Sequence, residues 1–262
     1  MCFDFDAVPP DLPPDLALAP IAGGAAAEPL ELSSADGTRF LAALAESPAP
    51  RAPAVLILPD VRGLYRFYSE LAERFAQAGH HAIALDYFGR TAGVAAREND
   101  WEYMPHVDQT TLAGIQSDTA AAIAALRDRT GARDVVAVGF CFGGLHAFLA
   151  AASPLDLAGV VGFYGALDGS RRGLPSPADV AAEMSGPVLG LFGGDDAAIS
   201  AAQVAHFDER LGAAGVEHEI VTYPGAPHSF FDRKYAEYAD ACEDAWRRTL
   251  QFLQGIGERA PA

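Results

Sequence analysis

Short apolar runs recur along the chain and are separated by longer stretches of mixed polarity. Such runs, bounded by turn residues, are typical of strands buried on both faces, whereas the mixed stretches fit amphipathic helices. Their alternation predicts an α/β fold in which helices cover both faces of a mostly parallel sheet. The predicted strands are residues 55–58, 82–85, 159–164, 187–192 and 219–223 and one that begins at Val135; the predicted helices are residues 67–78, 112–129, 201–214 and 234–254, and residues 89–110 are expected to form a long polar loop.

The first part of the chain departs from this alternation. Residues 1–27 are rich in Pro and Ala and show no sustained period, which indicates an extension ahead of the folded domain. Two apolar segments, 30–32 and 38–45, flank a turn that ends at Gly37 and predict an antiparallel hairpin. With 262 residues, half of them hydrophobic, the chain is long enough to bury one large core. We therefore expect a single domain over residues 28–262.

Composition and charge narrow the class of partner. The formal net charge is −17, and Lys234 is the only lysine, so the sequence lacks the clustered cations that nucleic acid or an anionic membrane requires. The N-terminus has acidic residues and prolines where a secretory signal needs positive charge, and three scattered cysteines do not suggest a disulfide framework. No set of His, Asp or Glu residues has metal-ligand spacing. We expect a cytoplasmic monomer that binds a small molecule and uses no metal or cofactor.

A nucleophile elbow is the first candidate for chemistry. The predicted strand from Val135 runs into Gly139-Phe140-Cys141-Phe142-Gly143, and an Ala- and Leu-rich helical stretch follows. A side chain at the tip of a sharp strand-to-helix turn needs small neighbours, which Gly139 and Gly143 provide. The position at a helix N-terminus favours a thiolate on Cys141. The alternative is a glycine-rich turn that holds a buried, inert cysteine.

An acid and a base follow this cysteine in the order that an α/β-hydrolase requires. Asp195 and Asp196 come directly after the predicted strand 187–192, and His228 comes after strand 219–223 and a Pro-containing turn. Each residue therefore stands at the C-terminal end of a strand. A histidine after such a turn is otherwise an ordinary exposed loop residue, but three coincident placements favour a triad of Cys141, His228 and one of the two aspartates.

With these motifs in place, the chain resembles the dienelactone hydrolase (carboxymethylenebutenolidase) family of α/β-hydrolases. The resemblance runs from about Leu30 to the C-terminus, and it rests on the cysteine elbow, the acid turn 193–196 and the histidine turn 225–230. It implies that Asp196, rather than Asp195, is the triad acid. It also implies an oxyanion hole formed by the backbone N–H groups of Phe142 and Val61.

The resemblance extends to substrate-binding positions, with two departures. Residues 86–90 match a family segment whose arginine binds the substrate carboxylate, which implies that role for Arg90; the alternative is an exposed loop arginine. Asp60 stands where the family has a glutamate near the nucleophile, and the alternative for Asp60 is a carboxylate that caps local backbone N–H groups. The family's second carboxylate-binding arginine is replaced by Asp232 followed by Arg233, so the match there is off by one position.

These residues predict a hydrolase that cleaves activated esters or lactones, such as enol lactones, through an acyl-cysteine intermediate. A thiolate leaves more readily than an alkoxide, so a cysteine nucleophile favours activated esters over alkyl esters. Two alternatives remain open. One is a broader carboxylesterase or thioesterase for other activated esters, and the other is a non-catalytic ligand-binding protein on the same fold.

Overall fold

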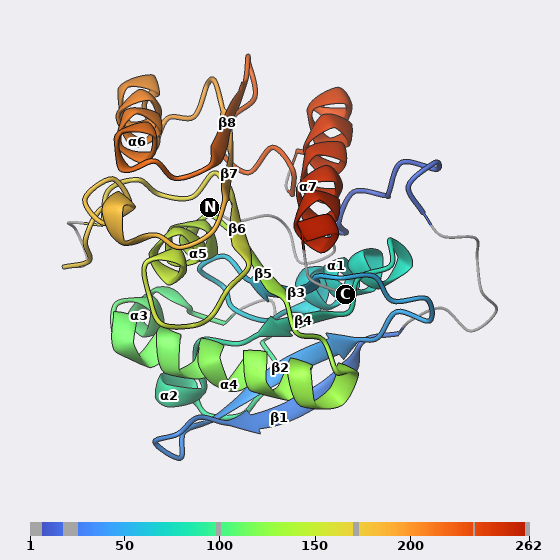
Figure 1. The fold of residues 1–262 in the computed structure, drawn as a ribbon. Helices are drawn as coiled ribbons and strands as arrows, with labels where there is room; N and C mark the ends of the chain where they lie inside the picture. The colour runs from blue at the N-terminus through green and yellow to red at the C-terminus, as the bar shows by residue number, and fades with distance from the viewer. Residues whose placement is uncertain (1–6, 18–25, 98–100, 170–172, 233, 260–262) are drawn as a thin grey trace.

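The structure is a computed structural model that describes residues 7–17, 26–97, 101–169, 173–232 and 234–259. Eight strands form one sheet in the order β1-β2-β4-β3-β5-β6-β7-β8 (Figure 1). β1 pairs antiparallel with β2, and β2 pairs antiparallel with β4, whereas the pairings from β4 to β8 are parallel. The strands are β1 Glu28–Ser33, β2 Arg39–Ala45, β3 Ala54–Leu58, β4 Ala82–Leu85, β5 Val135–Phe140, β6 Gly159–Phe163, β7 Val188–Gly193 and β8 His218–Tyr223.

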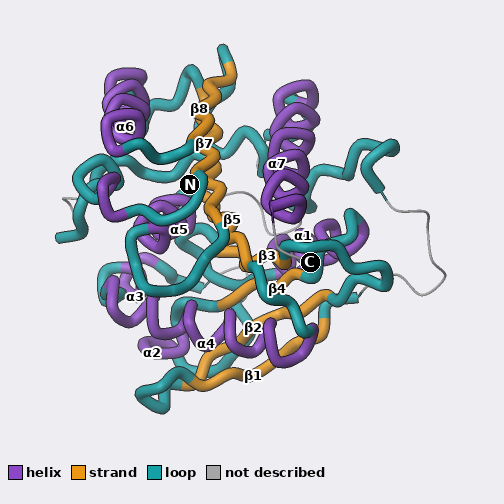
Figure 2. The backbone as a smooth tube through the Cα atoms, viewed as in Figure 1, coloured by secondary structure: helices purple, strands orange, loops and turns teal. Residues whose placement is uncertain are grey.

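Helices cover both faces of this sheet. Figure 2 shows α1 and α7 on one side of the strands and α4, α5 and α6 on the other. The prediction of a mostly parallel, helix-covered sheet with an N-terminal antiparallel hairpin is confirmed. The longer helices are α1 Arg66–Gln77, α4 Leu112–Thr130, α5 Phe142–Ala151, α6 Ala201–Ala214 and α7 Ala239–Arg259.

Two predicted segments differ from the structure by more than a residue or two at an end. The region expected as a polar loop contains two one-turn helices, α2 Gly89–Ala92 and α3 Met104–Val107. The last helix was expected over residues 234–254, but it begins at Ala239 because residues 234–238 form a turn in which the N–H of Tyr238 donates to the carbonyl of Lys234. It continues past Gly255 because Ile256 is buried.

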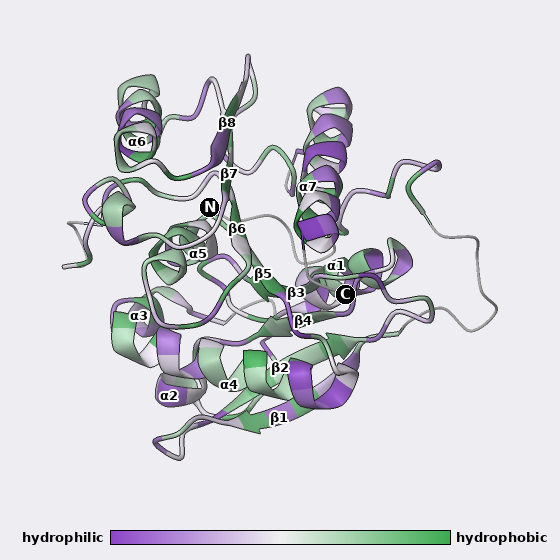
Figure 3. Cartoon of the chain, in the orientation of Figure 1, coloured by the Kyte–Doolittle hydropathy of each residue, from purple (hydrophilic) through white to green (hydrophobic). Residues whose placement is uncertain are grey.

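The hydropathy pattern reflects the layers. β5 is buried at each of its positions, whereas α7 buries Cys242, Ala245, Trp246, Thr249, Leu253 and Ile256, at the spacing of one helix face. Figure 3 shows the contrast between the hydrophobic strand and the many hydrophilic residues of α7. No helix in the described ranges has the length and apolar character needed to span a membrane.

Part of the N-terminal extension lies against the outer helices. The indole N–H of Trp246 in α7 donates to the carbonyl of Pro10 at 3.3 Å, and Leu12 is buried. Arg247 binds both carboxylate oxygens of Asp15 at 2.8 and 2.9 Å. We call residues 7–17 the N-terminal arm. The remainder of the predicted extension, 1–6 and 18–25, lies outside the described residues.

Candidate active site

The predicted strand-to-helix turn at Cys141 forms between β5 and α5. Cys141 has φ 54° and ψ −109°, a left-handed conformation that a non-glycine residue adopts only under strain. The turn needs its glycines, because a Cβ on Gly139 would lie 2.0 Å from the carbonyl oxygen of Gly143. A Cβ on Gly143 would likewise lie 2.0 Å from the carbonyl oxygen of Leu58. Cys141 is partly exposed at this turn.

Asp196 lies just after β7, and its carboxylate is fully buried. Nδ1 of His228 lies 2.7 Å from Oδ2 of Asp196, and the N–H groups of Ala198 and Ile199 donate to Oδ1. Burial acts to raise the pKa of Asp196, but the hydrogen bonds from His228 and the backbone outweigh it and hold the pKa below its ordinary value. Asp195 is exposed.

His228 follows β8 and the turn after it. Because the Asp196 carboxylate can only accept, Nδ1 of His228 carries the hydrogen, and Nε2 is the nitrogen able to exchange a proton. The imidazole is about a quarter exposed, at 28%, and its ring centroid lies 5.1 Å from that of Tyr164. Ser229, the next residue, has a positive φ of 61°. The acid and base of the predicted triad are therefore in hydrogen-bond contact beside β5 to β8.

The two predicted oxyanion residues lie on adjoining segments. Close contact of Gly143 with the carbonyls of Leu58 and Pro59 places the start of α5 against the end of β3. The hydroxyl of Tyr87 donates to the Pro59 carbonyl at 3.0 Å, and its ring packs on Phe142 at 5.4 Å. Val61 follows Pro59 by two residues. Convergence of the Val61 and Phe142 N–H groups on one substrate oxygen stays a prediction.

Asp60 is buried between these segments, with 2% of its surface exposed. Its carboxylate accepts the backbone N–H of Arg62 at 2.8 Å and lies 3.8 Å from the Arg62 guanidinium. Its own N–H donates to the hydroxyl of Tyr68 at 2.9 Å. Asp60 therefore does cap a local N–H group, and it does so at the end of the strand that adjoins the elbow.

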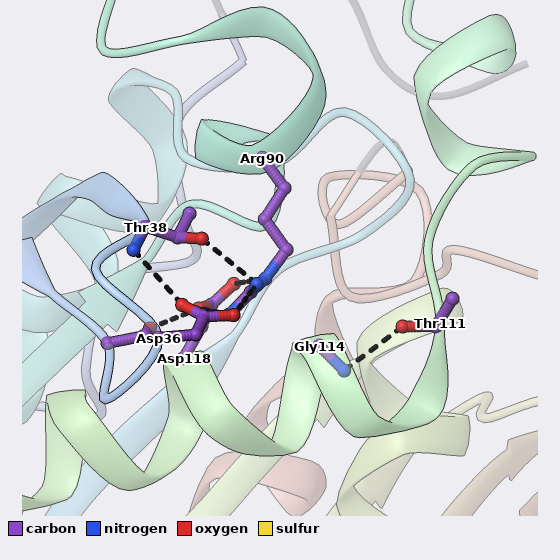
Figure 4. A network of polar contacts seen from close by, with 7 residues as sticks. Asp36, Thr38, Arg90, Thr111, Gly114 and Asp118 are labelled. Atoms are coloured by element: carbon purple, nitrogen blue, oxygen red, sulfur yellow. Dashed lines mark hydrogen bonds and ion pairs between the residues drawn. The ribbon is translucent and has the colours of Figure 1, made fainter.

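Arg90 has partners other than the expected substrate. All five of its N–H donors are engaged within the protein, by Asp36, Thr38 and Asp118 (Figure 4). Nη2 lies 2.7 Å from Asp118, whose side chain is fully buried. Hydrogen bonds to Asp118 and then Asp36 raise the pKa of Arg90. In this arrangement each donor of Arg90 already has a protein partner, and the buried Asp118 carboxylate is balanced by this cation. A contact of Arg90 with a substrate carboxylate stays a prediction.

Sequence reasoning missed Tyr164, which touches the candidate triad. It follows β6 directly, as Cys141 follows β5, and the two strands pair at Phe140 and Phe163. Its hydroxyl donates to Oδ2 of Asp232 at 2.9 Å, and its φ is 38°. The signal available in the sequence was its place at the carboxyl end of a central strand. Asp232 is buried, and Arg233 lies outside the described residues.

Two free cysteines are described, and they differ in environment. Cys242 is buried in α7, where its thiol donates to the carbonyl of Phe230 at 3.4 Å. Burial, followed by the charge of Asp232, raises the pKa of Cys242 to about 12. Cys2 lies outside the described residues. In the described ranges no group of three or more His, Cys, Asp or Glu residues is arranged to hold a metal ion.

Comparison with known sequences identifies one family. The model of the dienelactone hydrolase family matches residues 40–257. A Methylorubrum extorquens protein named "Putative carboxymethylenebutenolidase" is 32% identical over 213 residues, which cover 78% of this chain and 72% of that protein. A Synechocystis protein of the same name is 32% identical over 221 residues, with 77% and 85% of the two chains covered.

Solved structures give the same fold. A Klebsiella pneumoniae structure described as a "Putative Dienelactone Hydrolase" superposes with a TM-score of 0.73 at 29% identity and covers 87% of this chain and 99% of that one. A Pyrococcus furiosus esterase superposes with a TM-score of 0.67 at 15% identity, with 95% and 98% covered, and bears on the fold alone. These neighbours and the strand order confirm the predicted α/β-hydrolase fold.

Proposed function

Because the chain belongs to the dienelactone hydrolase family, and is thus a hydrolase, we propose that it cleaves activated esters or lactones through Cys141, His228 and Asp196. The observation that carries this proposal is the 2.7 Å contact between Nδ1 of His228 and Asp196, in a fold that strains Cys141 into an elbow. The remaining steps follow from the chemistry of these groups.

In the first half-reaction, Nε2 of His228 accepts the proton of the Cys141 thiol, and Asp196 stabilises the resulting imidazolium. The sulfur forms a bond to the ester carbonyl carbon, and the oxyanion accepts hydrogen bonds from the N–H groups of Phe142 and Val61. When the C–O bond breaks, the alkoxide or enolate takes the proton from His228. The product is an acyl-cysteine.

In the second half-reaction, His228 removes a proton from water as the water oxygen bonds to the acyl carbon. The C–S bond then breaks, the sulfur regains a proton, and the carboxylic acid leaves. No cofactor is needed for either step. Because a thiolate leaves more readily than an alkoxide, the intermediate from an alkyl ester reverts, whereas enol lactones and aryl esters expel a stabilised oxyanion.

The proposal also includes a reducing, cytoplasmic setting and a monomeric chain. A thiol nucleophile needs protection from oxidation, and the described cysteines, Cys141 and Cys242, are both free. Strand, elbow, acid and base all come from this one chain. Size-exclusion chromatography with light scattering is expected to give one copy, about 27.4 kDa.

The test is hydrolysis of an aryl acetate and an enol lactone by wild type and by Cys141→Ala. We expect hydrolysis to disappear in the folded variant, and brief reaction of the wild type to leave an acyl group on Cys141 that peptide mass spectrometry locates. Near-wild-type turnover by a folded Cys141→Ala protein would reject the mechanism. Stoichiometric acylation of wild-type Cys141 without turnover would favour the non-catalytic binding protein.

A further inference from the structure

Tyr164 lies between the nucleophile turn and the candidate acid, at the carboxyl end of β6. The N–H of Cys141 donates to the carbonyl of Phe163 at 3.0 Å. On the other side, the N–H of Tyr164 donates to the carbonyl of Leu191 in β7 at 2.7 Å, and β7 is the strand that precedes Asp196. The backbone of Tyr164 is thus tied into the sheet beside both the nucleophile and the acid.

The backbone of Tyr164 is also held in a strained conformation. Its φ is 38°, in the left-handed region that a bulky residue rarely adopts. The next residue, Gly165, packs closely against α5, because a Cβ there would lie 2.6 Å from the carbonyl carbon of Gly144. Such strain persists only where the surrounding structure fixes the residue, and it clusters at functional sites. The side chain is fully buried, so packing fixes the direction in which it points.

That side chain contacts three alternate residues of the loop that carries the candidate base. The ring centroid of Tyr164 lies 5.1 Å from that of His228 and 5.6 Å from that of Phe230. Its hydroxyl donates to Oδ2 of Asp232 at 2.9 Å. Phe230 and Asp232 are both buried. Residues 228–232 therefore pack around one side chain whose own backbone adjoins the nucleophile turn.

The hydroxyl of Tyr164 is suited to hold this loop and not to exchange protons. Burial, followed by the charge of Asp232, raises the pKa of Tyr164 well above its ordinary 10.0. The phenol therefore stays protonated near neutral pH and keeps donating to Asp232. The charge of Cys141 contributes to the same shift in pKa, because the phenol lies close to the nucleophile.

We propose that Tyr164 is a positioning residue that holds the imidazole of His228 in line for proton transfer with Cys141. The proposal rests on the proposed function, since that transfer is a step of its mechanism. The hydrogen bond from Nδ1 to Asp196 fixes one corner of the imidazole but leaves the ring free to tilt about it, and contact with the Tyr164 ring limits that tilt. Both half-reactions move a proton through Nε2, so a tilted ring slows both of them.

The experiment compares wild type with Tyr164→Phe and with the matched control Tyr223→Phe. Tyr223, at the end of β8, also donates to an aspartate at 2.9 Å, in this case Asp244, and its ring packs on Phe230 at 5.0 Å. Each substitution thus removes one tyrosine–aspartate hydrogen bond beside the same loop. Of the two tyrosines, Tyr164 is the one whose ring contacts the imidazole of His228.

Two quantities are measured for each folded protein: kcat and KM for 4-nitrophenyl acetate, and the rate at which iodoacetamide alkylates Cys141 as a function of pH. We expect Tyr164→Phe to lower kcat by about tenfold and to leave KM within about twofold of wild type. A misaligned imidazolium stabilises the thiolate less, so alkylation of Cys141 in this variant should require a pH higher by about half a unit or more. Tyr223→Phe is expected to match wild type in both measurements.

A folded Tyr164→Phe protein with wild-type kcat, or with a wild-type alkylation profile, overturns the proposal. An equal loss in Tyr223→Phe also overturns it, because the effect then comes from general loosening of the loop. If Tyr164→Phe does not fold, Phe230→Leu removes a ring contact from the loop side and is expected to change both quantities in the same directions. Failure of wild type to hydrolyse the ester rejects the proposed function, whereas alkylation needs no turnover and still tests the alignment of His228 with Cys141.

Discussion

Two hydrogen-bonded pairs of this molecule, Arg90 with Asp118 and His228 with Asp196, resemble each other in distance but differ in whether a nitrogen remains for further chemistry. Both N–O distances are 2.7 Å, and in both pairs the carboxylate is fully buried. Arg90 uses every donor on protein groups, whereas His228 keeps Nε2 in a partly exposed ring. A guanidinium whose donors are all bound by the protein contributes to the stability of the fold. An imidazole that uses only Nδ1 in its pair can also exchange a proton at Nε2.

The largest effect expected from this contrast is on turnover. Asp196→Asn should lower kcat for an aryl ester by about four orders of magnitude, because an amide can donate to Nδ1 and hold the wrong tautomer of His228. Asp195→Asn, at the exposed neighbour, should leave kcat close to wild type. Steady-state kinetics of both variants is the measurement. A larger loss in Asp195→Asn would show that the acid of the triad is misassigned.

The two described cysteines extend the contrast to thiols. Cys242 is buried, hydrogen-bonded and has its pKa raised to about 12, so at pH 7.5 its alkylation should be on the order of 10³-fold slower than that of a free thiol. Cys141, partly exposed at a helix N-terminus, should react first. Timed iodoacetamide labelling with peptide mapping measures both rates, and a Cys141→Ser protein is the control. Earlier labelling of Cys242 would contradict the expectation.

Arg90→Ala should lower the stability of the fold while leaving turnover nearly unchanged, the reverse of the effect expected for Asp196→Asn. It leaves the carboxylate of Asp118 buried without its cation, so the free energy of unfolding should fall by about 3 kcal/mol in urea titrations. Turnover of a neutral aryl ester per folded molecule should change little. Arg66→Ala removes an exposed guanidinium paired with Glu70 and serves as the control, with stability unchanged within error. A stable Arg90→Ala protein that is inactive on neutral esters would show that Arg90 acts in catalysis and not in the stability of the fold.

The smallest effect concerns pH and stability. The pKa of Asp196 is lower in the folded protein than its ordinary 3.8, so its ionised form stabilises the fold. That contribution is fully present above the unfolded pKa and is lost as pH falls through the lower folded value. Below about pH 4, the unfolding free energy of wild type should therefore fall more steeply than that of Asp196→Asn. Parallel curves for the two proteins would show that the carboxylate is not stabilised by folding.

The fold and the turns that hold the candidate triad residues could be predicted because their signals are local in the sequence. The strand-to-helix turn is encoded by five consecutive residues, 139–143, and glycines or prolines follow the predicted strand ends. The partners of Arg90 could not be predicted, because Asp36 and Asp118 are separated from it by 54 and 28 residues. A family resemblance transfers the residue type at such a position, but not the direction in which its side chain is held.

The packing of the N-terminal arm has a spectroscopic consequence. The chain has two tryptophans, Trp101 and Trp246, and the second is buried where the arm, Phe75 of α1 and Phe231 meet. In a Trp101→Phe protein, the remaining indole therefore emits from an apolar setting while the arm is docked, and its emission moves to longer wavelength when water reaches it. Because Phe231 also packs against Phe163, just ahead of Tyr164, a single fluorophore reports from the side of the sheet opposite α5 on the packing behind the ring that contacts His228.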